Sequence, residues 1–212
     1  MENSVHVNHI DDIVMQRTNQ TSVVIDLGTG SGALPRALLQ AGYTNLHLVD
    51  IEKQFQLPDM SGYQFYRTDL NFEPLPFTDG FADCVILNST VEHLENHYFV
   101  IREAARVLKP GGTLLVTIPN IHSLRSKLRF LFTGNLLGYT DTNNHLSVYT
   151  RATFKKAFFP FFKIVDVRHS RGYVKIPYRR VKNGWFHKKI HFPSKPTKGL
   201  FSNDVIYILE RL

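Results

Sequence analysis

Short apolar segments alternate with amphipathic ones through the first half of the chain. The apolar segments lie at residues 22–27, 46–50, 63–69, 83–88 and 113–119. Segments of this length, rich in aliphatic and aromatic residues, are typical of strands buried in a sheet. Between them, residues 32–42 and 97–108 carry apolar side chains at helical spacing. Strands that alternate with helices predict βαβ units and a parallel sheet.

The second half of the chain is less regular. An amphipathic helix is predicted at 123–132, and Thr150 is placed to cap a helix at 151–158. Two further strands are predicted at 161–168 and 204–211. The remaining segments, 133–149 and 170–203, are predicted to be loops, and a loop as long as the second one is uncommon in a compact domain unless it is functional or mobile.

Length and composition favour one soluble domain over residues 1–212. The hydrophobic content of 43% is ordinary for a globular protein. The N-terminus lacks the apolar region of a signal peptide, and no apolar stretch reaches the ~20 residues that span a bilayer. We therefore expect a cytoplasmic protein. The single cysteine, Cys84, excludes an intramolecular disulfide and a cysteine-based metal site. We expect it to be buried and inert, and we expect no metal.

Charge is divided unequally between the two halves. Residues 1–118 hold 7 Lys and Arg against 14 Asp and Glu, and residues 119–212 hold 18 against 4. Either the second half is a lysine-rich solvated face, or it attracts an anion while the first half receives a cation. The sequence leaves both interpretations open.

A glycine-rich turn follows the first predicted strand. Gly28, Gly30 and Gly32 permit the backbone angles of a tight strand-to-helix turn and let a ligand approach the main chain. Together with Ala33 the turn also satisfies the dinucleotide pattern G-x-G-x-x-G/A. The turn itself contains no Lys or Arg, and three acids accompany it: Asp26 precedes the glycines, and Asp50 and Asp69 end the next two strands. This arrangement suits a cationic nucleoside without phosphate better than a pyrophosphate.

Four segments together resemble a known enzyme family. They are VVIDLGTGSG at 23–32, LVDIEK at 48–53, YRTDLN at 66–71 and the stretch from Phe81 to Asn120 that contains EHL and RVLKPGG. In this order and spacing they resemble the class I S-adenosylmethionine-dependent methyltransferases. Segments 118–134 and 144–158 further resemble the small ubiquinone-type and methionine-biosynthesis-type methyltransferases.

The resemblance implies a fold and a division of the chain. The fold would be a Rossmann-like, doubly wound α/β sheet of seven mostly parallel strands, with an antiparallel last strand and helices on both faces. Residues 22–120 would form the cofactor-binding core. Residues 121–150 and 170–203 would cover the substrate.

The resemblance also implies the cofactor, S-adenosylmethionine, and the residues that bind it. The glycines would pass under its methionine part, with Asp26 anchoring the turn or the amino group. Asp50 would hold the ribose hydroxyls. The implied cofactor residues are Asp26, Gly28, Gly30, Gly32, Asp50, Ile51 against the adenine, Asp69 and Leu70 on the adenine side, and Asn88 on the sulfonium side.

Methyl transfer needs a base only when the acceptor atom carries a proton. Four residues are candidates for this role: Glu92 and His93 after the fourth strand, and His145 and Tyr149 in the later loop. Histidine titrates near neutrality, which suits the task. Each histidine could equally be structural, and the sequence does not choose among the four.

The basic second half bears on the partner. Its charges and interleaved aromatic residues fit an anionic or carrier-linked small molecule, an anionic membrane surface or RNA. Two other functions compete with that of a small-molecule methyltransferase. Tyr178 and Lys182 satisfy the Y-x-x-x-K pattern of short-chain oxidoreductases, which we interpret as chance. A methyltransferase-like module that binds cofactor or partner without catalysis is the other.

Overall fold

A seven-stranded sheet forms the centre of the computed structural model, which describes residues 10–55, 57, 61–170, 173–181, 184–191 and 199–212. The strand order is β3-β2-β1-β4-β5-β9-β6. The strands are β1 (Val24–Leu27), β2 (Leu46–Asp50), β3 (Tyr63–Arg67), β4 (Ala82–Asn88), β5 (Leu108–Pro119), β6 (Phe162–His169) and β9 (Asp204–Arg211). Strand β9 is antiparallel to both of its neighbours, and the other pairs are parallel. The predicted sheet is confirmed.

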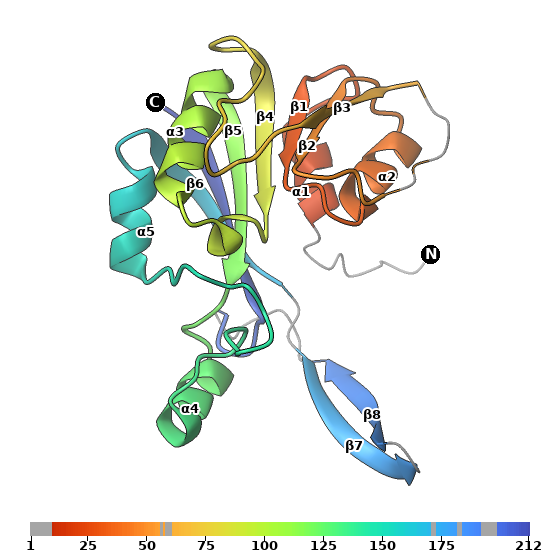
Figure 1. The fold of residues 1–212 in the computed structure, drawn as a ribbon, viewed down its shortest axis with the longest axis vertical. Helices are drawn as coiled ribbons and strands as arrows, with labels where there is room; N and C mark the ends of the chain where they lie inside the picture. The colour runs from red at the N-terminus through yellow and green to blue at the C-terminus, as the bar shows by residue number, and fades with distance from the viewer. Residues whose placement is uncertain (1–9, 56, 58–60, 171–172, 182–183, 192–198) are drawn as a thin grey trace.

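Helices cover both faces of this sheet (Figure 1). On one face, α1 (Ile10–Arg17) and α2 (Ala33–Gln40) pack against side chains such as Cys84 and Ile86. On the other face, α3 (His97–Val107) and α5 (Arg151–Phe158) pack against Val85 and Leu87. Alternate residues of β4 therefore enter two different cores, which explains why its sequence is apolar almost throughout. Cys84 is buried as expected, and burial raises the pKa of its thiol to about 12.

The prediction of a loop over 170–203 was wrong for much of that segment. Residues Tyr173–Val181 (β7) and Gly184–His191 (β8) pair as an antiparallel two-stranded sheet. Pro177 obscures the strand pattern, and the register shifts between Pro177 and Arg179, as is usual where a proline interrupts a ladder. Tyr178 thus lies in a strand, not on a helix, while Lys182 falls outside the described residues. The side chains of residues 171–198, which include nine of the 18 Lys and Arg residues in the second half of the chain, also fall outside the described part.

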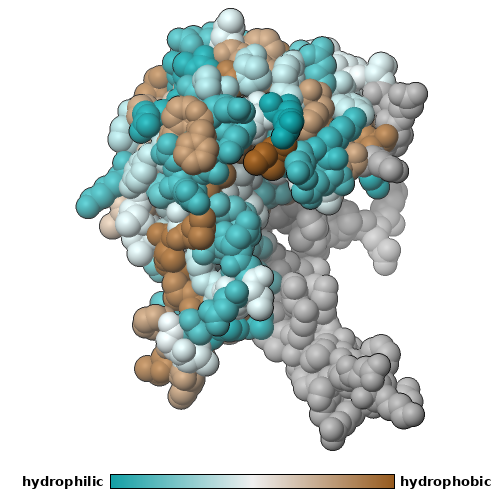
Figure 2. Space-filling model, in the orientation of Figure 1, coloured by the Kyte–Doolittle hydropathy of each residue, from teal (hydrophilic) through white to brown (hydrophobic). Residues whose placement is uncertain are grey.

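Helix α4 (Leu124–Thr133) and the β7–β8 hairpin project beyond the carboxyl ends of the parallel strands (Figure 1). The Ser123 hydroxyl caps α4 by accepting a hydrogen bond from the Ser126 amide at 3.2 Å. Apolar side chains are exposed along this helix (Figure 2): Leu124, Leu128, Phe130, Leu131 and Phe132. Among the described residues, no helix combines the length and the apolar character that crossing a bilayer requires.

Candidate functional site

A cavity of about 470 Å³ opens at the carboxyl ends of β1, β2 and β4. This edge, where the strand order reverses, is the usual ligand position in open α/β sheets. Six predicted cofactor residues line the cavity: Gly28, Gly30, Asp50, Ile51, Asp69 and Leu70. The other three, Asp26, Gly32 and Asn88, are not among its lining residues. The structure therefore brings most of the predicted cofactor residues, but not all of them, around one cavity.

The three glycines of the turn serve different purposes. Each has a positive φ: 78° at Gly28, 54° at Gly30 and 73° at Gly32. A Cβ at Gly28 would lie 2.6 Å from Thr90 Cγ2, and one at Gly32 would lie 2.8 Å from Phe55 Cβ. A Cβ at Gly30 would have only the Gly28 carbonyl oxygen near it, at 4.0 Å. Gly28 and Gly32 therefore permit close internal packing, and Gly30 leaves open space beside the backbone.

Asp50 joins the glycine turn to the end of β2. Its Oδ2 accepts a hydrogen bond from the Gly30 amide at 2.8 Å, and its Oδ1 accepts one from the Ile51 amide at 2.8 Å. Each carboxylate oxygen has a second acceptor site, so both can still bind hydroxyl groups. The geometry therefore holds an acceptor pair at the rim of the cavity, as a ribose diol requires.

Asp26 has a different environment from Asp50. Its side chain is only 4% exposed. Burial, and next the nearby Asp50 carboxylate, raise the pKa of Asp26 to about 7. A direct contact between Asp26 and a ligand stays a prediction, because the residue supports the turn without lining the cavity.

Asp69 follows β3 and organises the turn after it. Its Oδ1 accepts from the Asn71 amide at 2.9 Å, and its own amide donates to Glu73 Oε2 at 2.8 Å. Leu70 beside it is buried. Asp69 therefore has the structural role of a turn carboxylate while it also lines the cavity.

The sequence alone did not single out several other lining residues. They are Gln54, Thr68, Asn71, Ser89, Thr90, Leu94 and Asn144. Ser89 has a φ of 55°, the only positive value at a residue other than glycine within the described part of the chain. Strained backbone of this kind gathers at functional sites, but it leaves no mark in a sequence. Position was the available signal, because Thr68 and Ser89 directly follow strands.

Three of the four candidate catalytic residues meet beside this cavity. Glu92 and His93 lie in the short 3₁₀ helix η1 (Val91–His93) after β4, and His145 lies in the loop before α5. Their nearest ligand atoms all lie within 4.8 Å of one another. The His93 and His145 rings meet edge to face at 4.5 Å, and His93 lines the cavity. The cluster is therefore in contact with the candidate cofactor space through His93.

Glu92 is completely buried. Both of its carboxylate oxygens are without a hydrogen-bond partner among the described residues. Burial, and to a smaller extent Asp204, raise the pKa of Glu92 to about 7. The buried Tyr149 hydroxyl also has no partner within the described part of the chain, and burial raises its pKa above the ordinary range. Unpartnered buried polar groups of this kind are rare and are found at functional sites.

The loop that carries His145 is held against η1. The Glu92 carbonyl accepts from the Leu146 and Ser147 amides at 2.7 and 3.0 Å. His93 Nδ1 lies 3.3 Å from the Asn144 carbonyl oxygen, and Ser147 Oγ lies 3.0 Å from His97 Nδ1. These contacts join residues about fifty positions apart and place one wall of the site.

The same cluster also has the donor set of a small metal site. One carboxylate and two imidazoles within 4.8 Å match the ligand types that divalent transition metals accept. The expectation of no metal rested on the absence of a cysteine cluster, but a carboxylate with two imidazoles can bind a metal without cysteine. An acid beside two histidines also serves proton transfer, so the donor set alone does not select a metal.

Comparison with known proteins supports the methyltransferase resemblance that the glycine turn and its acids indicate. Residues 25–116 match the family model described as "Methyltransferase domain". Dimethylglycine N-methyltransferase of Parasynechococcus marenigrum is 31% identical over 107 residues, which are 47% of this chain and 38% of that protein. Residues 25–116 of this chain are therefore similar to a methyltransferase domain, and S-adenosylmethionine is the cofactor of such domains.

A second relative and a solved structure are also methyltransferases. The mitochondrial ubiquinone biosynthesis O-methyltransferase of Rattus norvegicus is 28% identical over 131 residues, 58% of this chain and 38% of that protein. The chain thus spans well under half the length of these curated relatives. A solved S-adenosylmethionine-dependent methyltransferase of Archaeoglobus fulgidus superposes with a TM-score of 0.63 at 17% identity, over 96% of this chain and 93% of that chain. The structural likeness confirms the predicted Rossmann-like fold.

Proposed function

We propose that this methyltransferase transfers the methyl group of S-adenosylmethionine to an oxygen or nitrogen atom of a small molecule. One observation carries the proposal: Gly30, Asp50, Asp69 and His93 line a single cavity at the reversal point of the sheet. The acids suit the hydroxyls, amino groups and positive charge of the cofactor, while His93 lies beside the Glu92 and His145 cluster. The relatives named for dimethylglycine and for ubiquinone biosynthesis act on small molecules, which supports this substrate class.

The residues of the cavity have separate tasks in this proposal. Asp50 binds the ribose hydroxyls, and the backbone beside Gly30 receives the methionine part. Asp69, Leu70 and Ile51 surround the adenine. The sulfonium is already activated, so the protein mainly aligns the acceptor atom for in-line displacement and excludes water.

The Glu92, His93 and His145 cluster takes up the proton that the methylated atom loses. If His93 Nδ1–H donates to the Asn144 carbonyl, Nε2 carries the free lone pair. When the acceptor oxygen or nitrogen attacks the methyl group, its proton passes to this nitrogen. Glu92, whose pKa lies near 7, stabilises the resulting imidazolium by its negative charge. His145 completes the cluster, and Tyr149 contributes a buried hydroxyl close to it.

Binding and turnover test the proposal in sequence. Calorimetry with S-adenosylhomocysteine should show binding that Asp50→Asn weakens and that Glu52→Gln, an exposed neighbour, leaves unchanged. Binding of NAD or NADP in place of S-adenosylhomocysteine would contradict the proposal. A panel of small amines, phenols and quinols, assayed by release of S-adenosylhomocysteine, then identifies the acceptor. Cofactor binding without turnover on any acceptor, RNA included, would support a non-catalytic module.

A further inference from the structure

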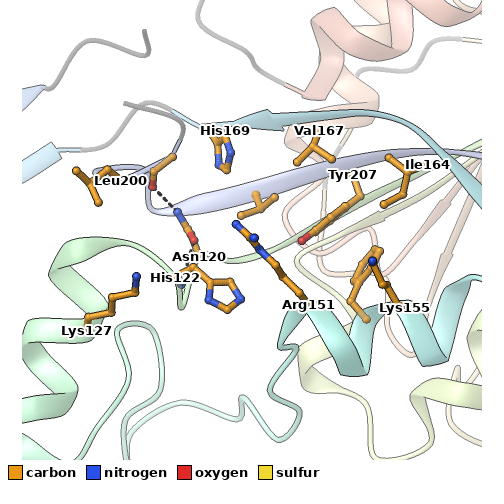
Figure 3. A pocket seen from close by; sticks show the side chains of 13 residues that line it. Asn120, His122, Lys127, Arg151, Lys155, Ile164, Val167, His169, Leu200 and Tyr207 are labelled. Carbon is orange, nitrogen blue, oxygen red and sulfur yellow. Dashed lines mark hydrogen bonds between the residues drawn. The ribbon is translucent and has the colours of Figure 1, made fainter. Parts of the chain in front are cut away.

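A second and larger cavity lies apart from the cofactor site. Its volume is about 900 Å³, and it shares no lining residue with the cavity around Asp50. It lies between α5, the edge strand β6 with its neighbour β9, and the residues that follow β5 (Figure 3). The methyl-transfer proposal above assigns no role to this cavity.

Positive charge gathers around this cavity. Lys127 of α4 and Arg151 and Lys155 of α5 line it together with His122 and His169, and no Asp or Glu is among its lining residues. Arg151 and Lys155 are four positions apart and so share one face of α5. Figure 3 shows Arg151 extending from the start of α5 into the middle of the group. Within the described residues, none of the three cations forms an ion pair with an acid.

The pKa values of His122 and His169 are consistent with this positive charge. Burial, and next the charge of Arg151, lower the pKa of both His122 and His169, and Lys127 adds to the effect at His122. His122 Nε2 is buried and has no hydrogen-bond partner in the described part of the chain. A buried polar atom without a partner, facing cations without counter-ions, is the arrangement that an anion would satisfy.

Apolar side chains form the rest of the wall. Phe154 stacks on Tyr207 with ring centroids 3.8 Å apart, and Ile164, Val167 and Val205 lie around them. A bare inorganic anion would leave this surface without contacts. The lining therefore suits a ligand with an apolar or aromatic body beside its charge.

The wall opposite α5 is held in place by internal hydrogen bonds. The buried Asn120 donates from Nδ2 to the Gly199 carbonyl at 2.7 Å (Figure 3) and to Ser202 Oγ at 2.6 Å. A Cβ at Gly199 would lie 2.3 Å from His169 Cε1, so the glycine leaves the space that this ring fills. On this side the cavity is therefore bounded by a fixed turn.

We propose that this cavity binds an anionic group, a phosphate or a carboxylate, carried on an apolar body. Arg151 and Lys155 neutralise the anion. His122 Nε2 donates a hydrogen bond to it, either as the imidazolium or as the neutral tautomer that is protonated at Nε2. Phe154 and Tyr207 contact the apolar part of the ligand. The anion belongs either to the distal end of the methyl acceptor or to a separate ligand. The proposal does not depend on methyl transfer, because none of these residues lines the cofactor cavity.

Defined probes test the site by calorimetry on the purified protein. We expect hexyl phosphate or hexanoate to bind, and hexanol, hexylammonium and inorganic phosphate to bind at least tenfold more weakly. Arg151→Gln and Lys155→Gln each remove one cation and should weaken hexyl phosphate binding about tenfold or more, as the loss of a charge-assisted hydrogen bond does. Lys156→Gln is the matched control, because it removes an exposed lysine of the same helix that does not line the cavity.

A second measurement locates the bound probe. The imidazole NMR signals of His122 and His169 should shift when hexyl phosphate is added to the wild-type protein. Equal affinity for hexyl phosphate and hexanol, or equal losses in Arg151→Gln and Lys156→Gln, would overturn the proposal. Absence of any probe binding would overturn it as well.

The cofactor proposal is tested separately by S-adenosylhomocysteine binding, which should be the same in all three variants. Failure of that binding with retained hexyl phosphate binding would count against the cofactor and not against this site. Once an acceptor is known, a raised KM in Arg151→Gln assigns the anion to the acceptor. An unchanged KM assigns it to a separate ligand.

Discussion

Glu92→Gln should remove a pH-dependent loss of stability from the wild-type protein. The pKa of Glu92 rises from 4.5 to about 7 because its carboxyl group is buried. Below pH 4.5 the group is protonated in both states. Between pH 4.5 and 7 the unfolded chain releases the proton while the folded protein retains it, so the free energy of unfolding falls with rising pH. The loss is complete above pH 7.

The magnitude follows from the size of this shift. One pKa unit corresponds to about 1.4 kcal/mol, so burial of Glu92 costs roughly 3 kcal/mol above pH 7. Glutamine has nearly the same shape and no charge to ionise. The stability of Glu92→Gln relative to wild type should therefore increase by roughly 3 kcal/mol between pH 4.5 and pH 7.5.

Urea unfolding at a series of pH values measures this difference directly. The contribution of Asp26, whose pKa burial also raises, is common to both proteins and cancels. Glu95→Gln is the control, since Glu95 is exposed three residues further along. Parallel pH curves for wild type and Glu92→Gln would refute the reasoning, because a buried carboxyl group without hydrogen bonds must respond to ionisation.

The same substitution separates stability from catalysis. Glu92 does not line the cofactor cavity, so affinity for S-adenosylhomocysteine should not change. Turnover on the acceptor found by the panel should fall about 100-fold, the lower end of general acid–base contributions. A variant that is more stable at pH 7.5, binds cofactor and turns over slowly would match the proposed role of Glu92. Undiminished turnover would exclude it.

Three further substitutions test other parts of the site. Asp50→Ala should weaken S-adenosylhomocysteine binding about tenfold or more by calorimetry, since it removes the charged acceptor pair; unchanged affinity would remove Asp50 from the site. Gly28→Ala should lower the free energy of unfolding by about 2 kcal/mol more than Gly80→Ala does. Both glycines have a positive φ, but only a Cβ at Gly28 would meet Thr90, at 2.6 Å. Equal losses in urea unfolding would contradict the packing argument. Tyr149→Phe should leave the free energy of unfolding within about 1 kcal/mol of wild type or raise it, since the buried hydroxyl has no partner among the described residues; a larger loss would mean that the hydroxyl is bonded.

Local features of this protein were predictable from the order of its residues. The predicted strands agree with β1 to β4, β6 and β9 within about two residues, and the Thr150 cap begins α5 as expected. Strand β5 begins at Leu108, ahead of the predicted start at Thr113. The glycine turn and Asp50 were recognisable because strand, turn and acid follow one another at short spacing, and local periodicity is written directly in the order of residues.

Which distant residues meet could not be read from the sequence. The Glu92 and His145 side chains approach because backbone hydrogen bonds hold residues 146 and 147 against Glu92. The cationic cavity combines segments of α4, α5, β6 and β9 that are scattered over the second half of the chain. Strands β7 and β8 were not predicted, because Pro177 and its irregular pairing interrupt the strand pattern. Such contacts depend on how elements pack across the sheet, and no pattern within a single segment records them.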